Sequence, residues 1–185
     1  MRFTATRLAG AMLVDLEPLA DERGFFARSW CAREFAAHGF DAALVQCNVS
    51  FNRAAGTLRG LHWQDAPHPE AKLVRCTRGR IHDVIVDVRP RSPTFRQWLA
   101  VELAADAHTA LYIPHGFAHG FQSLEDASEV LYHMSDSFHP ECARGARFDD
   151  PAFAVEWPHA ERRIVSAKDL SYPPFAVQPT AGPGT

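Results

Sequence analysis

The sequence predicts an all-β jelly roll, in which two sheets close around a pocket and a few short helices lie at the edge. After residue 40, short alternating or continuous apolar runs are separated by Gly, Pro, Asp and Asn. Many short strands about ten residues apart, with Gly and Pro turns, are typical of a sandwich or barrel. A jelly roll suits their number, and the space between its sheets is the expected small-molecule site.

Composition narrows the class of protein further. With 185 residues, of which 46% are hydrophobic, the chain is long enough for one domain with its own core. A net charge of -3 gives no electrostatic reason for nucleic-acid binding, and no apolar run approaches the ~20 residues of a membrane helix. The N-terminal residues lack the apolar core of a signal peptide, so we expect a cytoplasmic protein. The four cysteines form no CxxC pair, which predicts neither a zinc ribbon nor a disulfide framework.

The sequence up to residue 77 predicts five strands and one helix. Residues 12–16 have strand character, and residues 21–26 have the pattern of a turn that enters a second strand. Ser29 is expected to cap a short helix over residues 31–38, which Gly39 ends. The next three strands are expected at 43–51, 57–63 and 71–77.

The next part of the chain has a turn at Gly79 and a strand over residues 81–88. Alternation places Asp83 and Asp87 on one face of this strand. Two carboxylates on one face indicate either a solvated face or a cavity that holds a cation or a lysine. Further strands are expected at 97–103, 109–113, 118–124 and 128–134.

The pattern weakens from Asp149 onward. Asp-Pro, Trp-Pro and Pro-Pro pairs predict an extended arm that wraps the barrel. Residues 177–185 contain no core-forming side chains, and we expect this tail to be disordered. The expected organisation is therefore a single domain over residues 1–176 followed by the tail.

The stretch Gly56-Thr-Leu-Arg-Gly-Leu-His-Trp-Gln64 carries the first candidate functional residues. Gly56 and Gly60 let the backbone turn and approach other groups closely. Arg59 carries a permanent charge on a fork that suits phosphate or carboxylate oxygens, and His62 can take or give a proton near neutral pH. Alone, such a pair is more often a buried histidine beside a surface arginine. The rest of the chain reverses that balance.

Further blocks accompany this stretch in unbroken order. They are Asp21-Glu-Arg-Gly-Phe-Phe26, Gln46-x-Asn48-x-Ser50, Lys72-Leu-Val-Arg-Cys76, Ser92-Pro-Thr-Phe95, Ile113-Pro-x-Gly-Phe-Ala-His-Gly-Phe121, Glu129-x-Leu-Tyr132, Asp150-Pro151, Trp157-Pro158 and Ser166-Ala-Lys-Asp169. Together with residues 58–62, these blocks resemble the dTDP-4-dehydrorhamnose 3,5-epimerases of the cupin superfamily. The resemblance implies a cupin jelly roll, a homodimer and an isomerase of deoxysugar (rhamnose-type) biosynthesis. Such an enzyme inverts C3 and C5 of a nucleotide-linked 4-keto-6-deoxyhexose without a cofactor.

The usual cupin metal motif is incomplete. Cupins commonly hold a metal through His-x-His, a later Glu and the His of Pro-x-Gly-x-x-His. This chain keeps His119 of the last motif, but the first has Gln64 after His62, and Lys72 stands where a carboxylate is expected. A lysine is a cation, and two histidines without further ligands make a poor transition-metal site. We therefore expect no metal in the barrel.

Epimerisation beside a carbonyl needs a base on one ring face, an acid on the other and a cation or donor at the carbonyl oxygen. The resemblance implies that His62 is the base, oriented by Asp169, and that Tyr132 is the acid. Lys72 would stabilise the enolate oxygen, with Asp83 positioning it. The substrate-binding residues that the resemblance implies are Arg23, Phe26, Gln46, Asn48, Arg59, Asp83, His119 and Phe138. Arg23 and Arg59 would clamp the diphosphate.

Several positions depart from the family pattern near the nucleotide. Arg28 and Ala143 replace usual glutamates, Cys47 replaces a common aspartate, and Ser137-Phe138 replaces a tyrosine pair. Chemistry on a 4-keto sugar is therefore better supported than thymidine as the base, although Phe138 keeps a ring face that can stack on a pyrimidine. The alternatives are inversion of C3 or C5 alone, another nucleotide, a metal-dependent cupin enzyme and a sugar-nucleotide binding module. In the homodimer, residues 21–28 are expected to cross to the partner.

Overall fold

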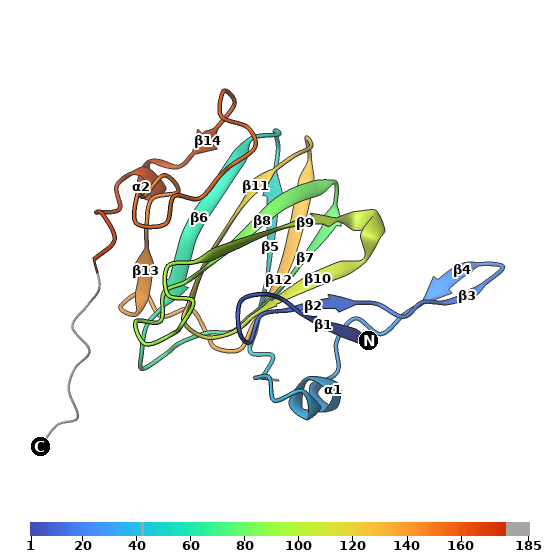
Figure 1. The fold of residues 1–185 in the computed structure, drawn as a ribbon. Helices are drawn as coiled ribbons and strands as arrows, with labels where there is room; N and C mark the ends of the chain where they lie inside the picture. The colour runs from blue at the N-terminus through green and yellow to red at the C-terminus, as the bar shows by residue number, and fades with distance from the viewer. Residues whose placement is uncertain (42, 177–185) are drawn as a thin grey trace, which may run out of the picture.

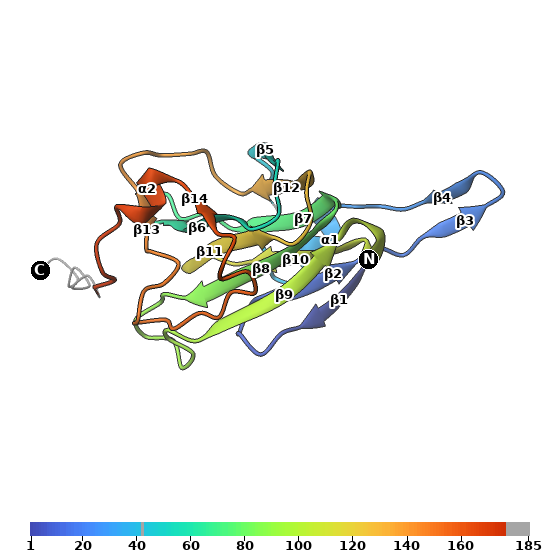
Figure 2. The same cartoon turned by 90° about the horizontal axis from the view of Figure 1, so that it is seen from above.

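Two β-sheets face each other across the centre of the molecule, as the sequence predicts (Figures 1 and 2). The computed structural model describes residues 1–41 and 43–176. The predicted disordered tail, residues 177–185, lies outside the described residues. Among those that are described, no helix has the length and apolar character needed to span a membrane.

The first sheet has the order β1-β2-β10-β7-β12-β5, and the second has the order β13-β6-β11-β8-β9, with β14 parallel beside β6. The strands of the first sheet are β1 (Arg2–Ala5), β2 (Met12–Asp15), β5 (Gln46–Asn52), β7 (Lys72–Arg78), β10 (Thr109–Ile113) and β12 (Ser128–Met134). Those of the second are β6 (Thr57–Gln64), β8 (Arg80–Asp87), β9 (Trp98–Ala104), β11 (Phe117–Ser123), β13 (Ala143–Gly145) and β14 (Ile164–Val165). The helices are α1 (Ala32–Ala37), α2 (Ala167–Leu170) and the 3-10 turn η1 (Ala105–Ala107).

The central core lies between the sheets, and a second core lies behind β8. Ile81 and Ile85 of β8 pack inward against Val74 and Leu111 of the first sheet. Val84 and Val86, on the opposite face of β8, pack with Phe153 and Trp157 of the C-terminal arm. Burial on both faces explains the uninterrupted apolar run Val84-Ile85-Val86 in this strand. The arm after residue 149 therefore covers the outer face of the second sheet, as predicted.

Helix α1 differs from its prediction at its start. Cys31 occupies the N-cap position without a side-chain cap hydrogen bond, so the prediction that Ser29 caps this helix is wrong. Its end is as predicted, because Gly39 follows the C-cap residue His38 with a φ of +75°. The sequence did not predict β1, β13, β14 or α2, which have only two to four residues each.

The segment after β2 forms a two-stranded hairpin of β3 (Leu19–Asp21) and β4 (Gly24–Phe26). This hairpin projects away from the sandwich (Figures 1 and 2), and all of its strand residues are exposed. An isolated two-stranded hairpin is at best marginally stable in water. We therefore expect this hairpin to pack against a second protein chain.

Candidate active site

Two adjoining cavities, of about 440 Å³ and 390 Å³, lie between the sheets. The residues that line both are His62, Lys72, Tyr132 and Lys168. His62 belongs to β6 of the second sheet, whereas Lys72 and Tyr132 belong to β7 and β12 of the first sheet. The predicted base and the predicted acid therefore reach the same space from opposite walls.

Close approach of β6 and β11 shapes the wall that carries His62. His62 lies directly opposite His119 in the register of these strands. Gly60 has a φ of +117°, and a Cβ on it would lie 2.5 Å from the Cα of Gly120. Only a glycine tolerates both conditions. This confirms the prediction that Gly60 allows a close approach.

His62 is hydrogen-bonded to Asp169, a buried carboxylate in the first turn of α2. Nε2 of His62 lies 2.7 Å from Oδ1 of Asp169, whose backbone N–H donates to Oγ of Ser166 at 3.1 Å. Ser166 is the N-cap of α2, so the helix cap is the serine and the carboxylate is left for the histidine. Asp169 is only 4% exposed.

Burial by itself raises the pKa of Asp169. The hydrogen bond with His62, the charge of His62 and the hydrogen bond from the Gly60 N–H together outweigh burial, so the pKa of Asp169 lies below its ordinary value. Asp169 therefore stays ionised at neutral pH. An ionised carboxylate at this position fixes the imidazole and stabilises its protonated form.

Lys72 has a different carboxylate partner from the one predicted. Its Nζ lies 2.8 Å from Oε1 of Glu70 and donates to the backbone oxygen of His62 at 3.3 Å. Oε1 of Glu70 is thus engaged, while Oε2 is buried without a hydrogen-bond partner among the described residues. Sequence reasoning missed Glu70. The available signal was its spacing, since residues two apart on an extended chain face the same side.

Asp83 pairs with His119 instead of Lys72, which corrects the predicted role. Its Oδ1 lies 2.8 Å from Nε2 of His119, because Asp83 is the diagonal neighbour of His119 across β8 and β11. Asp83 and Asp87 are both 0% exposed, so the solvated-face alternative for this strand is wrong. Asp83 has no surface with which to touch a substrate. His119 lines the larger cavity and is the member of the pair that faces it.

Arg59 and Tyr132 lie on the remaining walls of the larger cavity. Nε of Arg59 donates to Oδ1 of Asn52 at 2.9 Å, which aims an otherwise exposed guanidinium. Burial raises the pKa of the Tyr132 phenol above its ordinary value. The positive charge of Arg59 lowers this pKa by less than burial raises it, and the negative charge of Glu70 raises it further. The phenol therefore stays protonated and able to donate at neutral pH.

The smaller cavity collects the predicted nucleotide-side residues Gln46, Asn48 and Phe138. Oε1 of Gln46 accepts from the backbone N–H of Phe138 at 3.1 Å, and Nε2 of Gln46 donates to Asn48 at 3.2 Å. Phe138 is 52% exposed, so its ring is free to stack. Tyr172, which the sequence analysis missed, also lines this cavity, with its ring centroid 5.9 Å from that of His62.

Besides the buried Asp83, the predicted site residues that line neither cavity are Arg23 and Phe26. Both belong to the projecting hairpin, where Arg23 pairs with its neighbour Asp21. Their side chains are strongly exposed, with Phe26 at 74%.

A family model and several individual proteins match this chain. The family model described as dTDP-4-dehydrorhamnose 3,5-epimerase matches residues 5–177. The chain belongs to this family. The protein is therefore an epimerase, and its jelly roll is of the cupin type.

Individual members of the epimerase family cover nearly the whole chain. The dTDP-4-dehydrorhamnose 3,5-epimerase of Pseudomonas aeruginosa is 42% identical over 93% of this chain and 96% of its own. The dTDP-6-deoxy-D-glucose-3,5-epimerase of Legionella pneumophila, solved with dTDP-4-keto-L-rhamnose, is 35% identical, with a TM-score of 0.86 over 92% of this chain and 90% of its own. A 3'-monoepimerase of Streptomyces bikiniensis, solved with dTDP-quinovose, is 31% identical, with a TM-score of 0.85 over 92% and 86%. Epimerases of two centres and of one centre thus share this fold.

Proposed function

We propose that this protein inverts C3 and C5 of dTDP-4-dehydro-6-deoxyglucose to give the dTDP-4-dehydro-rhamnose product, without a cofactor. The observation that carries the proposal is that His62 and Tyr132 line one cavity from opposite sheets and that Lys72 lines the same cavity. Family membership supports the dTDP-linked 4-keto sugar as the substrate. Chain geometry supports the base and acid on opposite ring faces.

The hydrogens on C3 and C5 both flank the C4 carbonyl, so removing either one gives an enolate. In the proposed mechanism, His62 takes the proton and Asp169 stabilises the resulting imidazolium. The ammonium of Lys72, held by Glu70 at 2.8 Å, stabilises the negative charge on O4. Tyr132 then returns a proton from the opposite face, which inverts the centre.

A metal has no role in this proposal. Gln64 stands at the position of the second cupin histidine, and its side-chain amide is hydrogen-bonded through both its nitrogen and its oxygen. Nε2 of Gln64 donates to the backbone oxygens of His68 and Ser137, and Oε1 accepts from the backbone N–H of His139. An amide so engaged is a poor metal ligand, and Lys72 adds a positive charge to the same cavity.

Proton NMR in deuterated water with dTDP-4-dehydro-6-deoxyglucose tests the proposal. Deuterium should enter at both C3 and C5, and the L-rhamno product should form. Exchange and inversion at one carbon would favour the one-centre alternative. Turnover only with a sugar linked to another nucleotide would reject dTDP as the carrier.

Arg59 is proposed to bind the diphosphate, and its removal should weaken binding. Arg59→Ala should cost about 1–3 kcal/mol in binding of dTDP, because a charge-assisted hydrogen bond is lost. Calorimetric titration with dTDP measures this cost. Arg78→Ala is the matched control, since Arg78 is exposed and lines neither cavity. Equal affinities of Arg59→Ala and wild type would remove Arg59 from the clamp.

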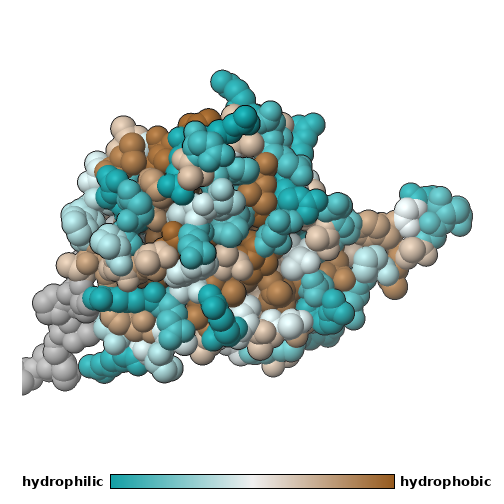
Figure 3. Space-filling view, turned by 45° about the horizontal axis from the view of Figure 1, so that its top comes forward, coloured by the Kyte–Doolittle hydropathy of each residue, from teal (hydrophilic) through white to brown (hydrophobic). Residues whose placement is uncertain are grey.

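The protein is proposed to act as a homodimer in which the hairpin crosses to the partner's site. Apolar side chains are exposed along the hairpin and along β5, at Leu19, Phe25, Phe26, Val49 and Phe51. Figure 3 shows hydrophobic surface along the projecting hairpin up to a polar tip. Large apolar side chains exposed in groups of this kind mark an interaction site. The crossing would carry Arg23 and Phe26 to a cavity that they do not reach in their own chain.

Mixing two impaired variants tests the crossing. If the hairpin serves the partner, a dimer of one Arg23→Ala chain and one His62→Ala chain holds one complete site. An equal mixture should then recover about a quarter of wild-type activity, because random pairing makes half of the dimers mixed. Each variant alone should stay impaired, and sedimentation should give twice the 20.6 kDa of one chain. A mixture no more active than its components would mean that each hairpin serves its own chain.

The cytoplasmic location expected from the sequence stays a prediction, which cell fractionation would test.

A further inference from the structure

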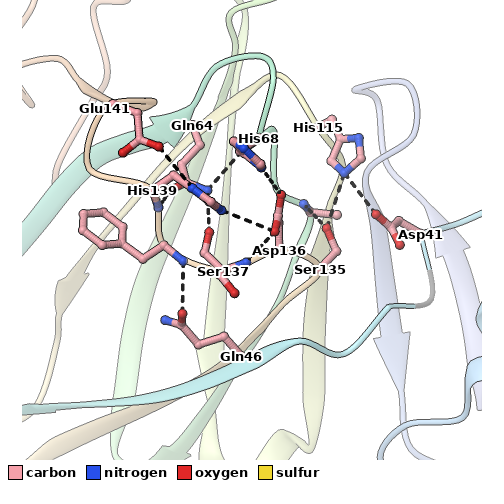
Figure 4. Close-up of polar contacts among 12 residues, drawn as sticks. Asp41, Gln46, Gln64, His68, His115, Ser135, Asp136, Ser137, His139 and Glu141 are labelled. Carbon is pink, nitrogen blue, oxygen red and sulfur yellow. Dashed lines mark hydrogen bonds and ion pairs between the residues drawn. The ribbon is translucent and has the colours of Figure 1, made fainter.

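A second cluster of histidines lies outside the proposed active site (Figure 4). His68 belongs to the connection between β6 and β7, and Asp136 and His139 belong to the connection between β12 and β13. Nδ1 of His68 lies 3.1 Å from Oδ2 of Asp136, and Nε2 of His139 lies 3.8 Å from Oδ1 of the same carboxylate. Sequence analysis assigned no role to any of the three.

The donor set of this cluster matches a borderline divalent metal. One potential ligand atom from each residue lies within 4.8 Å of the other two. Two imidazoles and one carboxylate are ligands that suit Zn²⁺, Co²⁺ or Ni²⁺ better than Mg²⁺ or Ca²⁺. We propose that His68, Asp136 and His139 bind a divalent transition-metal ion such as Zn²⁺.

The arrangement of the rings allows such an ion after a small rotation. The His68 and His139 rings stack with centroids 3.5 Å apart and an angle of 7° between their planes. Both present a nitrogen to Asp136 at the same edge of the stack. Binding requires the rings to turn apart until their lone pairs converge on one point. Both side chains lie on connections between strands and are partly exposed, at 37% and 27%, which gives the rings space to turn toward solvent.

Groups around the cluster would orient the ligands. Nδ1 of His139, the nitrogen that faces away from Asp136, lies 3.2 Å from Oε1 of Glu141. A carboxylate on the far nitrogen of a histidine fixes its tautomer and directs the other nitrogen to the metal. The backbone N–H of Ser137 donates to Oδ1 of Asp136 at 2.7 Å. The neighbouring pair of His115 and Asp41, 3.2 Å apart, offers only one imidazole and one carboxylate.

An ion at this position would join the two connections that border the smaller cavity. Gln64 already ties them, through the backbone oxygens of His68 and Ser137. Phe138, which lines the cavity, lies between Ser137 and His139. A metal ligated by Asp136 and His139 would therefore fix the backbone on both sides of Phe138. This site is separate from His62 and His119, where the sequence predicts no metal.

Calorimetric titration of the chelator-treated full chain with ZnCl₂ tests the site. All proteins would carry Cys47→Ser, because the exposed Cys47 thiol can bind Zn²⁺ by itself. The parent should bind one Zn²⁺ per chain. His139→Ala should weaken that binding at least about 100-fold, and Glu141→Gln, on a highly exposed side chain, about 10-fold. The matched control His115→Ala should bind as the parent does.

Cobalt gives an independent readout, since Co²⁺ bound by two imidazoles and a carboxylate acquires visible absorption that His139→Ala should lack. Absence of Zn²⁺ binding by the parent, or equal binding by parent and His139→Ala, would overturn the site. The expected effect of the metal on substrate binding, through Phe138, rests on the proposed function. Zn²⁺ should change the KM of the parent for the dTDP sugar at constant kcat, and it should leave the KM of His139→Ala unchanged. The zinc titration decides the site even if the sugar is not a substrate.

Discussion

Replacing His62 with alanine should abolish epimerisation, with a loss of at least about 1,000-fold in kcat, within the range of general-base catalysis. The loss should extend to exchange of the substrate's C3 and C5 hydrogens with deuterated solvent, because no proton is removed without a base. Asp169, which is 4% exposed and lies 2.7 Å from the imidazole, is set back from the position of the missing base. Proton NMR in deuterated water follows exchange and inversion in one experiment.

His115→Ala is the control for this experiment, because it also removes an imidazole beside an aspartate but lies outside both cavities. It should keep wild-type rates. The His62 side chain is 42% exposed, so its loss should leave the fold and the melting temperature nearly unchanged. Wild-type exchange in His62→Ala would assign the base to another residue.

The sequence predicted the secondary structure well where an element depends on residues close to one another along the chain. β10 and β12 were predicted with their observed bounds, because buried strands need apolar side chains at regular positions. β14 has two residues and exists only because it pairs with β6. No local pattern distinguishes such a strand from a loop.

Partners across sheets were the harder part of the site. The resemblance implied that Asp83 positions Lys72, and the opposite charges of the two side chains agree with such a pair. The register of β8 and β11 instead brings Asp83 to His119, while Glu70, two residues from Lys72, pairs with the lysine. The contact between His68 and Asp136 joins residues 68 positions apart and depends on which connections meet at the cavity mouth. Register and loop placement are non-local, and for that reason the sequence alone did not reveal them.

Replacing Tyr132 with phenylalanine should separate inversion from exchange. The variant keeps the ring and its packing but loses the phenol proton. His62 can still form the enolate, and it can return a proton to the face from which it took one. Exchange with solvent should therefore survive at one or both carbons, while inversion is lost or confined to one centre. The same NMR experiment measures both.

The raised pKa of Tyr132 strengthens this expectation. Burial opposes the charged phenolate, so the phenol is protonated across the neutral range and stands ready to donate. A group that acts only as this acid affects the second half of the reaction, after the enolate has formed. If Tyr132→Phe loses exchange as completely as His62→Ala, the phenol acts before or during enolisation, for example by donating to O4 beside Lys72. If the variant inverts both centres at the wild-type rate, Tyr132 has no part in the mechanism, and the acid must be sought among the other groups that line the cavity opposite His62.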